Sequence, residues 1–159
     1  MRRHASHIIC VIFLLFSASG MASIPESIGE QHQTGVFGII VSNPQGKKTF
    51  KVTNVVPFVE GQGYGWIIKL GAKFEKVKWT EVLRLPAEPR TWGRRQSHGE
   101  YQISDDRKVS VTEQEVAAKD GYIENFWSVA PGDPLGDYVI QVYVNGLLLK
   151  TFHFKVVKR

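Results

Sequence analysis

The chain alternates apolar and polar residues in short runs, and turn-forming residues separate one run from the next. Val36–Ser42 is the first such run, and Asn43-Pro44-Gln45-Gly46 after it favours a tight turn. Gly61, Gly63 and Gly65 predict a second, flexible turn. No stretch of a dozen residues keeps the apolar spacing of a helix, so the pattern predicts a protein built from β-strands. The further β-rich runs, each a candidate strand, are Thr49–Val56, Trp66–Phe74, Val77–Leu85, Tyr101–Ile103, Lys108–Thr112, Tyr122–Val129, Asp137–Val144 and Leu147–Val157.

One segment between these runs fits two readings. Thr112-Glu113-Gln114-Glu115 matches a capping box, and Val116-Ala117-Ala118-Lys119 could extend it by one or two helical turns before Gly121. The same residues could instead form the edge of a strand. The sequence leaves both interpretations open.

The last two runs predict a hairpin whose turn sets the register of both strands. A two-residue turn at Asn145-Gly146 would pair Val144 with Leu147, and that register puts the apolar side chains of the two strands on opposite faces. A three-residue loop that includes Val144, with its glycine in the left-handed region, brings Tyr138 opposite Phe152 on one core-facing side. We therefore predict a bulged turn.

Seven to eight short strands separated by turns predict an all-β fold. The most fitting architecture is an immunoglobulin-like antiparallel β-sandwich, and a small β-barrel is the alternative. Fifteen glycines and seven prolines suit a sheet protein with many turns. The composition, 43% hydrophobic and 22% charged, is that of a globular chain and not of a disordered one.

The N-terminus reads as an export signal. Arg2 and Arg3 precede the unbroken apolar run Ile8–Phe16, and small residues follow up to Ala22. The run is about half the ~20 residues that a membrane-spanning helix needs, so we expect a cleavable signal peptide and no stable membrane anchor after cleavage. The expected location is periplasmic or secreted.

This expectation divides the chain into three parts: a signal peptide at 1–22, a polar and flexible leader at 23–33, and a β-sandwich domain at 34–159. The only cysteine, Cys10, lies inside the signal and near the start of its apolar run. A lipoprotein needs its cysteine directly after that run, so we expect neither a lipid anchor nor a disulfide in the domain. Arg2 and Arg3 of the signal carry two of the formal +5 charges. The net charge of +3 that remains after cleavage, together with export, argues against a nucleic-acid partner.

No group of residues in the sequence has the spacing that catalysis or metal binding requires. His32, His98 and His153 stand far apart, no thiol joins them, and no G-x-S-x-G motif is present. Glu113 and Glu115 read as solvated surface. We therefore expect no catalytic residue, no metal site and no cofactor. Asp133 and Asp137 lie in a Pro/Gly-rich turn without the spacing of a calcium loop.

The most distinctive polar cluster is a basic segment in the long break between two predicted strands. It contains Arg90, Trp92, Arg94 and Arg95, with His98 nearby. Arginine forks bind carboxylates and phosphates, and an exposed tryptophan stacks on sugars or on partner side chains. We take these five residues as a candidate binding site for an unknown protein or an anionic glycan. In the alternative interpretation, the loop is solvated and Trp92 folds back into the core.

The C-terminal third resembles a bacterial family of exported immunoglobulin-like domains with no assigned function. The resemblance implies a sandwich fold and an exported location, and it supplies no catalytic or binding residues. The segments that carry it are Trp127-Ser128-Val129-Ala130-Pro131-Gly132, Gly136-Asp137-Tyr138, Gln141-Val142-Tyr143, Asn145-Gly146-Leu147-Leu148-Leu149 and Phe152-His153-Phe154, with Lys69-Leu70-Gly71-Ala72-Lys73-Phe74 and Val82-Leu83-Arg84-Leu85-Pro86 upstream.

Together these features favour an exported, non-enzymatic, envelope-associated binding or accessory module. One alternative is a carbohydrate-binding module, which requires at least two of Trp66, Trp79, Trp92 and Trp127 to be coplanar and solvent-facing. A periplasmic immunity-type inhibitor of a partner protein also fits the size of the chain. A small hydrolase would require acids such as Glu100, Asp105 or Glu113 to cluster beside His98.

Overall fold

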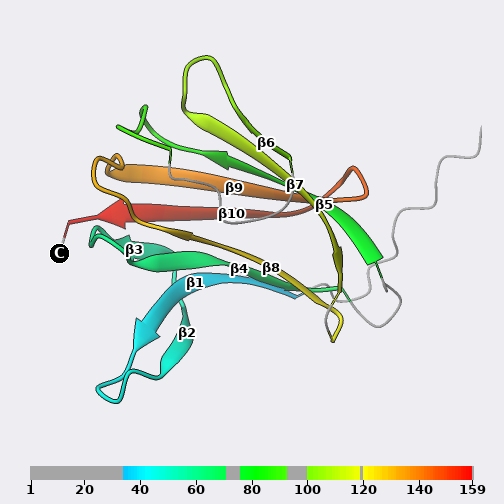
Figure 1. The fold of residues 1–159 in the computed structure, drawn as a ribbon, viewed down its shortest axis with the longest axis horizontal. Helices are drawn as coiled ribbons and strands as arrows, with labels where there is room; N and C mark the ends of the chain where they lie inside the picture. Colours follow the sequence, from blue (N-terminus) through cyan, green and yellow to red (C-terminus); the bar gives the residue numbers. More distant parts are fainter. Residues whose placement is uncertain (1–33, 71–75, 93–99, 119, 159) are drawn as a thin grey trace, which may run out of the picture.

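The chain folds into two packed β-sheets (Figure 1). The computed structural model describes residues 34–70, 76–92, 100–118 and 120–158, and within them it contains ten strands and no helix. The four-stranded sheet has the order β2-β1-β4-β8, and the six-stranded sheet has the order β3-β10-β9-β5-β7-β6. The strands are β1 (Gly35–Ser42), β2 (Lys48–Val52), β3 (Val55–Pro57), β4 (Gly63–Lys69), β5 (Lys76–Arg84), β6 (Glu100–Ile103), β7 (Val109–Ala117), β8 (Tyr122–Ser128), β9 (Gly136–Val144) and β10 (Leu147–Val157).

The predicted immunoglobulin-like sandwich is confirmed, and the described strands form no closed barrel. The predicted strand number, seven to eight, is too low. One reason is that the run from 49 to 56 is two strands, because the Thr53 hydroxyl accepts a hydrogen bond from the Val55 amide at 3.2 Å and turns the chain. β3 then leaves the first sheet and pairs with β10 in parallel, whereas the other strand pairs are antiparallel.

Two local predictions resolve in favour of strands. Residues Thr112–Glu115 belong to β7, which pairs with β5 along its whole length, so the helical interpretation is wrong. Glu113 gains a 2.8 Å ion pair with Lys78 of β5, which a capping box would not provide. Gly63 and Gly65 lie in β4 and not in the turn before it.

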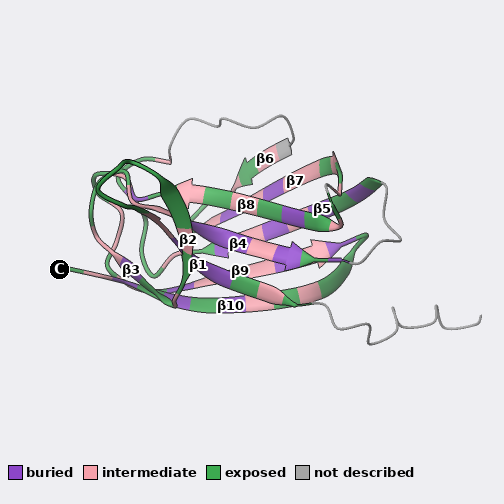
Figure 2. Cartoon of the chain, turned by 90° about the horizontal axis from the view of Figure 1, so that it is seen from below, coloured by how far each residue is buried: buried purple, intermediate pink, exposed green. Residues whose placement is uncertain are grey.

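The core lies between the sheets and is rich in aromatic side chains (Figure 2). Phe37 of β1 stacks on Phe154 of β10, with their ring centroids 4.3 Å apart. Trp66 of β4 meets Trp79 of β5 edge-on at 5.5 Å, and both rings are buried. Period-two burial along β5 and β9 places every second side chain in this core, as the sequence pattern predicts.

The last hairpin differs from its prediction in the place of the bulge. Val144 pairs directly with Leu147 across a two-residue turn, because Asn145 and its following glycine both adopt positive φ. The register then shifts between Leu148 and Lys150. This shift supplies the extra residue that the apolar pattern demands.

As a result, Phe152 pairs with Ile140 and Phe154 pairs with Tyr138, in place of the predicted pairing of Tyr138 with Phe152. All four side chains are buried between the sheets. The prediction that both apolar sets share one face is therefore correct, and the prediction of a three-residue turn is wrong.

Candidate functional site

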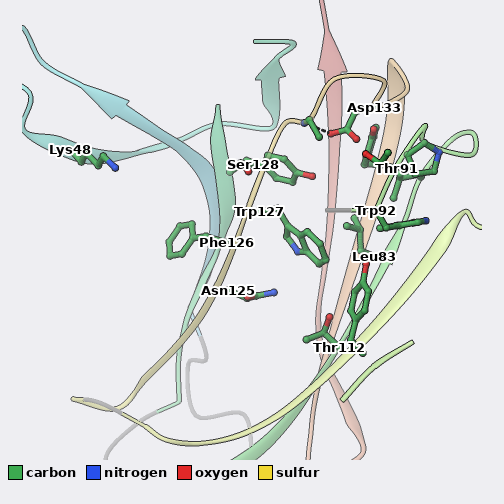
Figure 3. A pocket seen from close by; sticks show the side chains of 16 residues that line it. Lys48, Leu83, Thr91, Trp92, Thr112, Asn125, Phe126, Trp127, Ser128 and Asp133 are labelled. Atoms are coloured by element: carbon green, nitrogen blue, oxygen red, sulfur yellow. Dashed lines mark hydrogen bonds between the residues drawn. The ribbon is translucent and has the colours of Figure 1, made fainter. Parts of the chain in front are cut away.

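A cleft of about 510 Å³ lies where β8 ends the four-stranded sheet. Its walls come from both sheets, from the segment after β5 and from the turn before β9. Figure 3 shows its side chains converging from these elements. The lining residues that matter most below are Leu83, Trp92, Tyr101, Thr112, Asn125 and Trp127.

Three aromatic rings make up one part of the cleft wall. Trp127 of β8 meets Trp92 at 6.5 Å between ring centroids, with an angle of 67° between the planes. The Tyr101 ring of β6 also lies near Trp127, with 6.4 Å between the ring centroids and an angle of 43° between the planes. Trp92 also donates a 3.0 Å hydrogen bond from its indole nitrogen to the Arg107 carbonyl. The cluster therefore forms one wall of the cleft from tilted, half-buried rings.

This geometry does not provide the flat platform that the carbohydrate-binding alternative requires. Trp66 and Trp79 are buried in the core, and the two remaining tryptophans are far from coplanar. Stacking of a sugar ring needs a ring face that is open to solvent. The expectation of two coplanar, solvent-facing tryptophans is therefore wrong.

A fully buried carboxylate stands directly behind the cleft. Glu81 accepts hydrogen bonds from the indole nitrogen of Trp66, from Trp127 Nε1 at 2.7 Å and from Asn125 Nδ2 at 3.1 Å. One side chain of β5 thus connects to β4 and to two residues of β8. Because Asn125 and Trp127 also line the cleft, Glu81 holds that wall in place.

Sequence reasoning missed Glu81, although the signal was present. The side chains that face the core alternate along β5, at Val77, Trp79 and Leu83. Glu81 lies at the position of the same alternation that also faces the core. An acid at that position must be buried, and a buried acid must find hydrogen-bond donors. The indole N–H groups of nearby tryptophans are such donors.

Burial raises the pKa of Glu81 above its ordinary value of 4.5, and the hydrogen bonds from Trp66, Asn125 and Trp127 oppose this shift without cancelling it. Between the unfolded and the folded pKa, the native state holds a proton that the unfolded chain has released. The contribution of this group to stability is therefore complete below about pH 4.5 and is lost as the pH rises through the folded pKa.

We expect this dependence to appear as a difference between wild type and Glu81→Gln, whose side chain does not titrate. The free energy of unfolding of wild type minus that of the variant should fall as pH rises from about 4.5, and then level off. Urea unfolding at a series of pH values measures it. The lysine partners of Glu113 and Glu115 lower the pKa values of these two groups equally in wild type and variant, so their contribution to the difference in unfolding free energy cancels. A difference that rises with pH would contradict the assignment.

The cleft wall also contains a buried hydroxyl without a partner in the described residues. Thr112 is almost fully buried and lines the cleft, and its Oγ1 has no hydrogen-bond partner within the described residues. Ser110, two positions earlier on β7, has the same property at its Oγ. A buried hydroxyl without a partner costs about 1–3 kcal/mol, so a ligand group or a water molecule at this place would be favoured.

A half-buried acid lies at another point of the cleft wall. Asp133 accepts a 2.8 Å hydrogen bond from the Ala130 amide, and desolvation raises the pKa of its carboxyl group. It caps the turn before β9, as the sequence interpretation expected. Asp137 forms a 3.2 Å ion pair with Lys155 on the surface.

The predicted binding residues are only partly covered by the structure. Arg90 is exposed, and its amide donates a 3.1 Å hydrogen bond to the Gly132 carbonyl, beside the cleft. Trp92 lines the cleft and also packs against the core, and its role in binding stays a prediction. Arg94, Arg95 and His98 lie outside the described residues.

The acids proposed for a hydrolase do not gather in the cleft as far as they are described. Glu113 points to the outer side of β7, where it accepts hydrogen bonds from Lys78 and Thr80. Glu115 pairs with Lys76 on the same face at 2.8 Å. Asp105 is exposed in the turn between β6 and β7. The part of the chain that the structure describes also holds no helix of the length and apolar character needed to cross a membrane.

Comparisons with known proteins agree with this architecture. A family model described as "PM0630 beta sandwich domain" matches residues 36–157. No curated protein matches the chain. The structure is similar to that of an immunoglobulin-like protein (PA1606) from Pseudomonas aeruginosa, with a TM-score of 0.53 and 16% identity over 78% of this chain and 92% of that one. At this identity the similarity concerns the fold alone.

Two further structures are similar at lower scores. The soluble domain of PmoD from Methylocystis sp. has a TM-score of 0.37 and 17% identity over 76% of this chain and 90% of that one. The alkylpurine DNA glycosylase AlkC of Pseudomonas fluorescens, bound to DNA, has a TM-score of 0.35 and 13% identity over 77% of this chain and 30% of that one. Scores of this size carry no argument about function.

Proposed function

This chain belongs to the PM0630 β-sandwich domain family, and we propose that it is an exported, non-enzymatic binding module whose ligand site is the cleft beside β8. The observation that carries the proposal is the cleft itself. It joins aromatic rings with the buried Thr112 hydroxyl, which has no partner in the described residues, and the buried Glu81 supports its wall. Apolar walls with a few polar groups are the usual composition of a ligand site.

We infer the ligand class from the basic residues of this part of the chain. Arg90 is next to the lining residues Pro89 and Thr91, and Arg94 and Arg95 follow it in the sequence. Guanidinium groups bind carboxylates and phosphates through bidentate hydrogen bonds. We therefore propose an acidic partner protein or an anionic glycan as the ligand, with His98 among the candidate binding residues. From the N-terminal signal pattern we further propose that the chain meets this partner in the periplasm or outside the cell.

Charge reversal of the basic segment tests this function. We expect the Arg90→Glu/Arg94→Glu/Arg95→Glu variant to retain its partners about tenfold less well than wild type, which corresponds to ~1.4 kcal/mol. The immobilised chain is incubated with envelope extract and with an array of anionic glycans, and retained ligand is quantified.

A matched control reverses three exposed lysines of the C-terminal strand region, in Lys150→Glu/Lys155→Glu/Lys158→Glu. This control has the same charge change, and none of its three lysines lines the cleft. It should retain the partners of wild type. If both triple variants lose binding equally, or if neither does, the basic segment has no specific role and the proposed ligand class is wrong.

A further inference from the structure

The two sheets have four edge strands among the described residues, and three of these edges are protected. β3 has three residues and ends in Pro57, and β6 has four residues. β2 carries Lys48 and Lys51 within its five residues. Short length, proline and lysine are the devices by which proteins prevent an edge from pairing with another chain.

β8 is the exception among these edges. It pairs with β4 over seven residues, from Gly63 with Ser128 to Lys69 with Tyr122, without a bulge. No described strand pairs with its other side. Its only charge is Glu124, and it contains neither proline nor lysine. Tyr122 and Phe126 are 43% and 38% exposed on its outer face. A long, regular edge of this kind is suited to receive a further strand.

The space beside β8 has the right position for that strand. The six-stranded sheet continues through β7 and β6, and the four-stranded sheet ends at β8. The inner face of β7 there carries Ser110 and Thr112, whose buried hydroxyls have no partner in the described residues. A fifth strand next to β8 would face these residues across the sandwich.

The cleft also extends around the edge of β8. Its lining includes Asn125 and Trp127 on the inner side of this strand, and Phe126 and Ser128 on the outer side. In Figure 3, Lys48 and Phe126 stand on one side of the ribbon, while Trp127 stands on the other. Open space on both sides of an edge strand is the place that a neighbouring strand occupies, since its side chains also alternate between the two faces.

We propose that an extended segment of a partner protein adds to β8 as a fifth strand of the four-stranded sheet. Every second side chain of this segment enters the cleft beside Trp127 and Leu83. We expect these side chains of the partner to be apolar, except for a hydroxyl or amide opposite Thr112. The intervening side chains lie outside, next to Phe126, which is 38% exposed. The inference rests on the proposed function and narrows its ligand to a peptide segment.

The test uses a random library of 12-residue peptides displayed on phage, selected on the full chain with Cys10→Ser. Selected peptides are synthesised, and each backbone amide is methylated in turn. Because alternate amides of an added strand point to β8, methylation at every second position should weaken binding about tenfold, and methylation between them should leave it within about twofold. Hydrogen exchange of the β8 amides should slow on peptide binding, while exchange in β2 stays unchanged.

Several outcomes would overturn the inference. These are selected peptides without a period-two pattern, a methylation scan without alternation, no enrichment above a chain-free surface, or protection of β8 through a second copy of the chain. If the basic triple variant still loses envelope partners or anionic glycans in such a case, the proposed function stands and only the strand addition fails. If that variant also binds like wild type, the function fails as well.

Discussion

Replacement of Glu81 by alanine should lower the free energy of unfolding by about 3–5 kcal/mol. The substitution removes the shared acceptor of Trp66, Asn125 and Trp127, and it leaves three N–H groups in or next to the core without a partner. Each N–H group without a partner costs about 1–3 kcal/mol. The variant no longer buries a carboxyl group, and the desolvation energy saved in this way offsets part of that cost. Urea unfolding monitored by tryptophan fluorescence measures the loss.

The Glu81→Gln variant is the matched control, because it keeps the volume of the side chain and one acceptor oxygen. That oxygen can serve Trp66 and Asn125, which share one carboxylate oxygen, but the amide nitrogen then faces the indole N–H of Trp127. We expect a loss of about 1–3 kcal/mol, smaller than for alanine. If alanine costs less than about 1 kcal/mol, Glu81 does not connect the sheets in the way described.

Gly65→Ala should destabilise the domain by about 3 kcal/mol, although the change adds only a methyl group. A Cβ at this position of β4 would lie 2.1 Å from the Asn125 carbonyl oxygen and 2.9 Å from the Phe126 Cα, both in the backbone of β8. Backbone atoms in a paired strand cannot rotate away as a flexible side chain can. β8 must therefore move outward, and its hydrogen bond from Asn125 to Glu81 stretches.

Gly63→Ala on the same strand is the control for this substitution. There the Cβ would meet the Ile40 side chain at 3.1 Å, and that side chain can shift by a few tenths of an ångström. We expect a loss below about 1 kcal/mol. Thermal unfolding of both variants measures the contrast. Equal losses at the two positions would show that the close approach of β4 and β8 is not what requires glycine at 65.

The fold was accessible from sequence because it depends on local signals. Period-two alternation in Val77–Leu85 and Asp137–Val144 identifies strands with one core-facing side, and the Asn-Gly pair identifies the final hairpin. The position of the bulge could not be predicted from the sequence. Two solutions satisfy the same apolar pattern, a longer turn or a shift after Leu148, and the backbone preference of Asn145 and its glycine decides between them.

The candidate site was less accessible because its residues come from distant parts of the chain. Trp92, Tyr101, Thr112 and Trp127 meet only through the pairing of β6 with β7 and the packing of the two sheets. Of this group, the sequence singled out Trp92 in the basic segment and Trp127 in the carbohydrate-binding alternative. Glu81 had a signal in its phase on β5, but its donors are 15 or more residues away in the chain. The edge position of β8 follows from sheet order, which alternation does not encode.

Hydrogen exchange of the full chain, with and without the ligand that it retains from envelope extract or the glycan array, tests the central claim most directly. A ligand in the cleft should slow exchange at residues 122–128 of β8 and 110–112 of β7, and leave β10 unchanged. Slowed exchange confined to the outer face of the six-stranded sheet, with β8 and β7 unaffected, would contradict the assignment of the cleft as the ligand site.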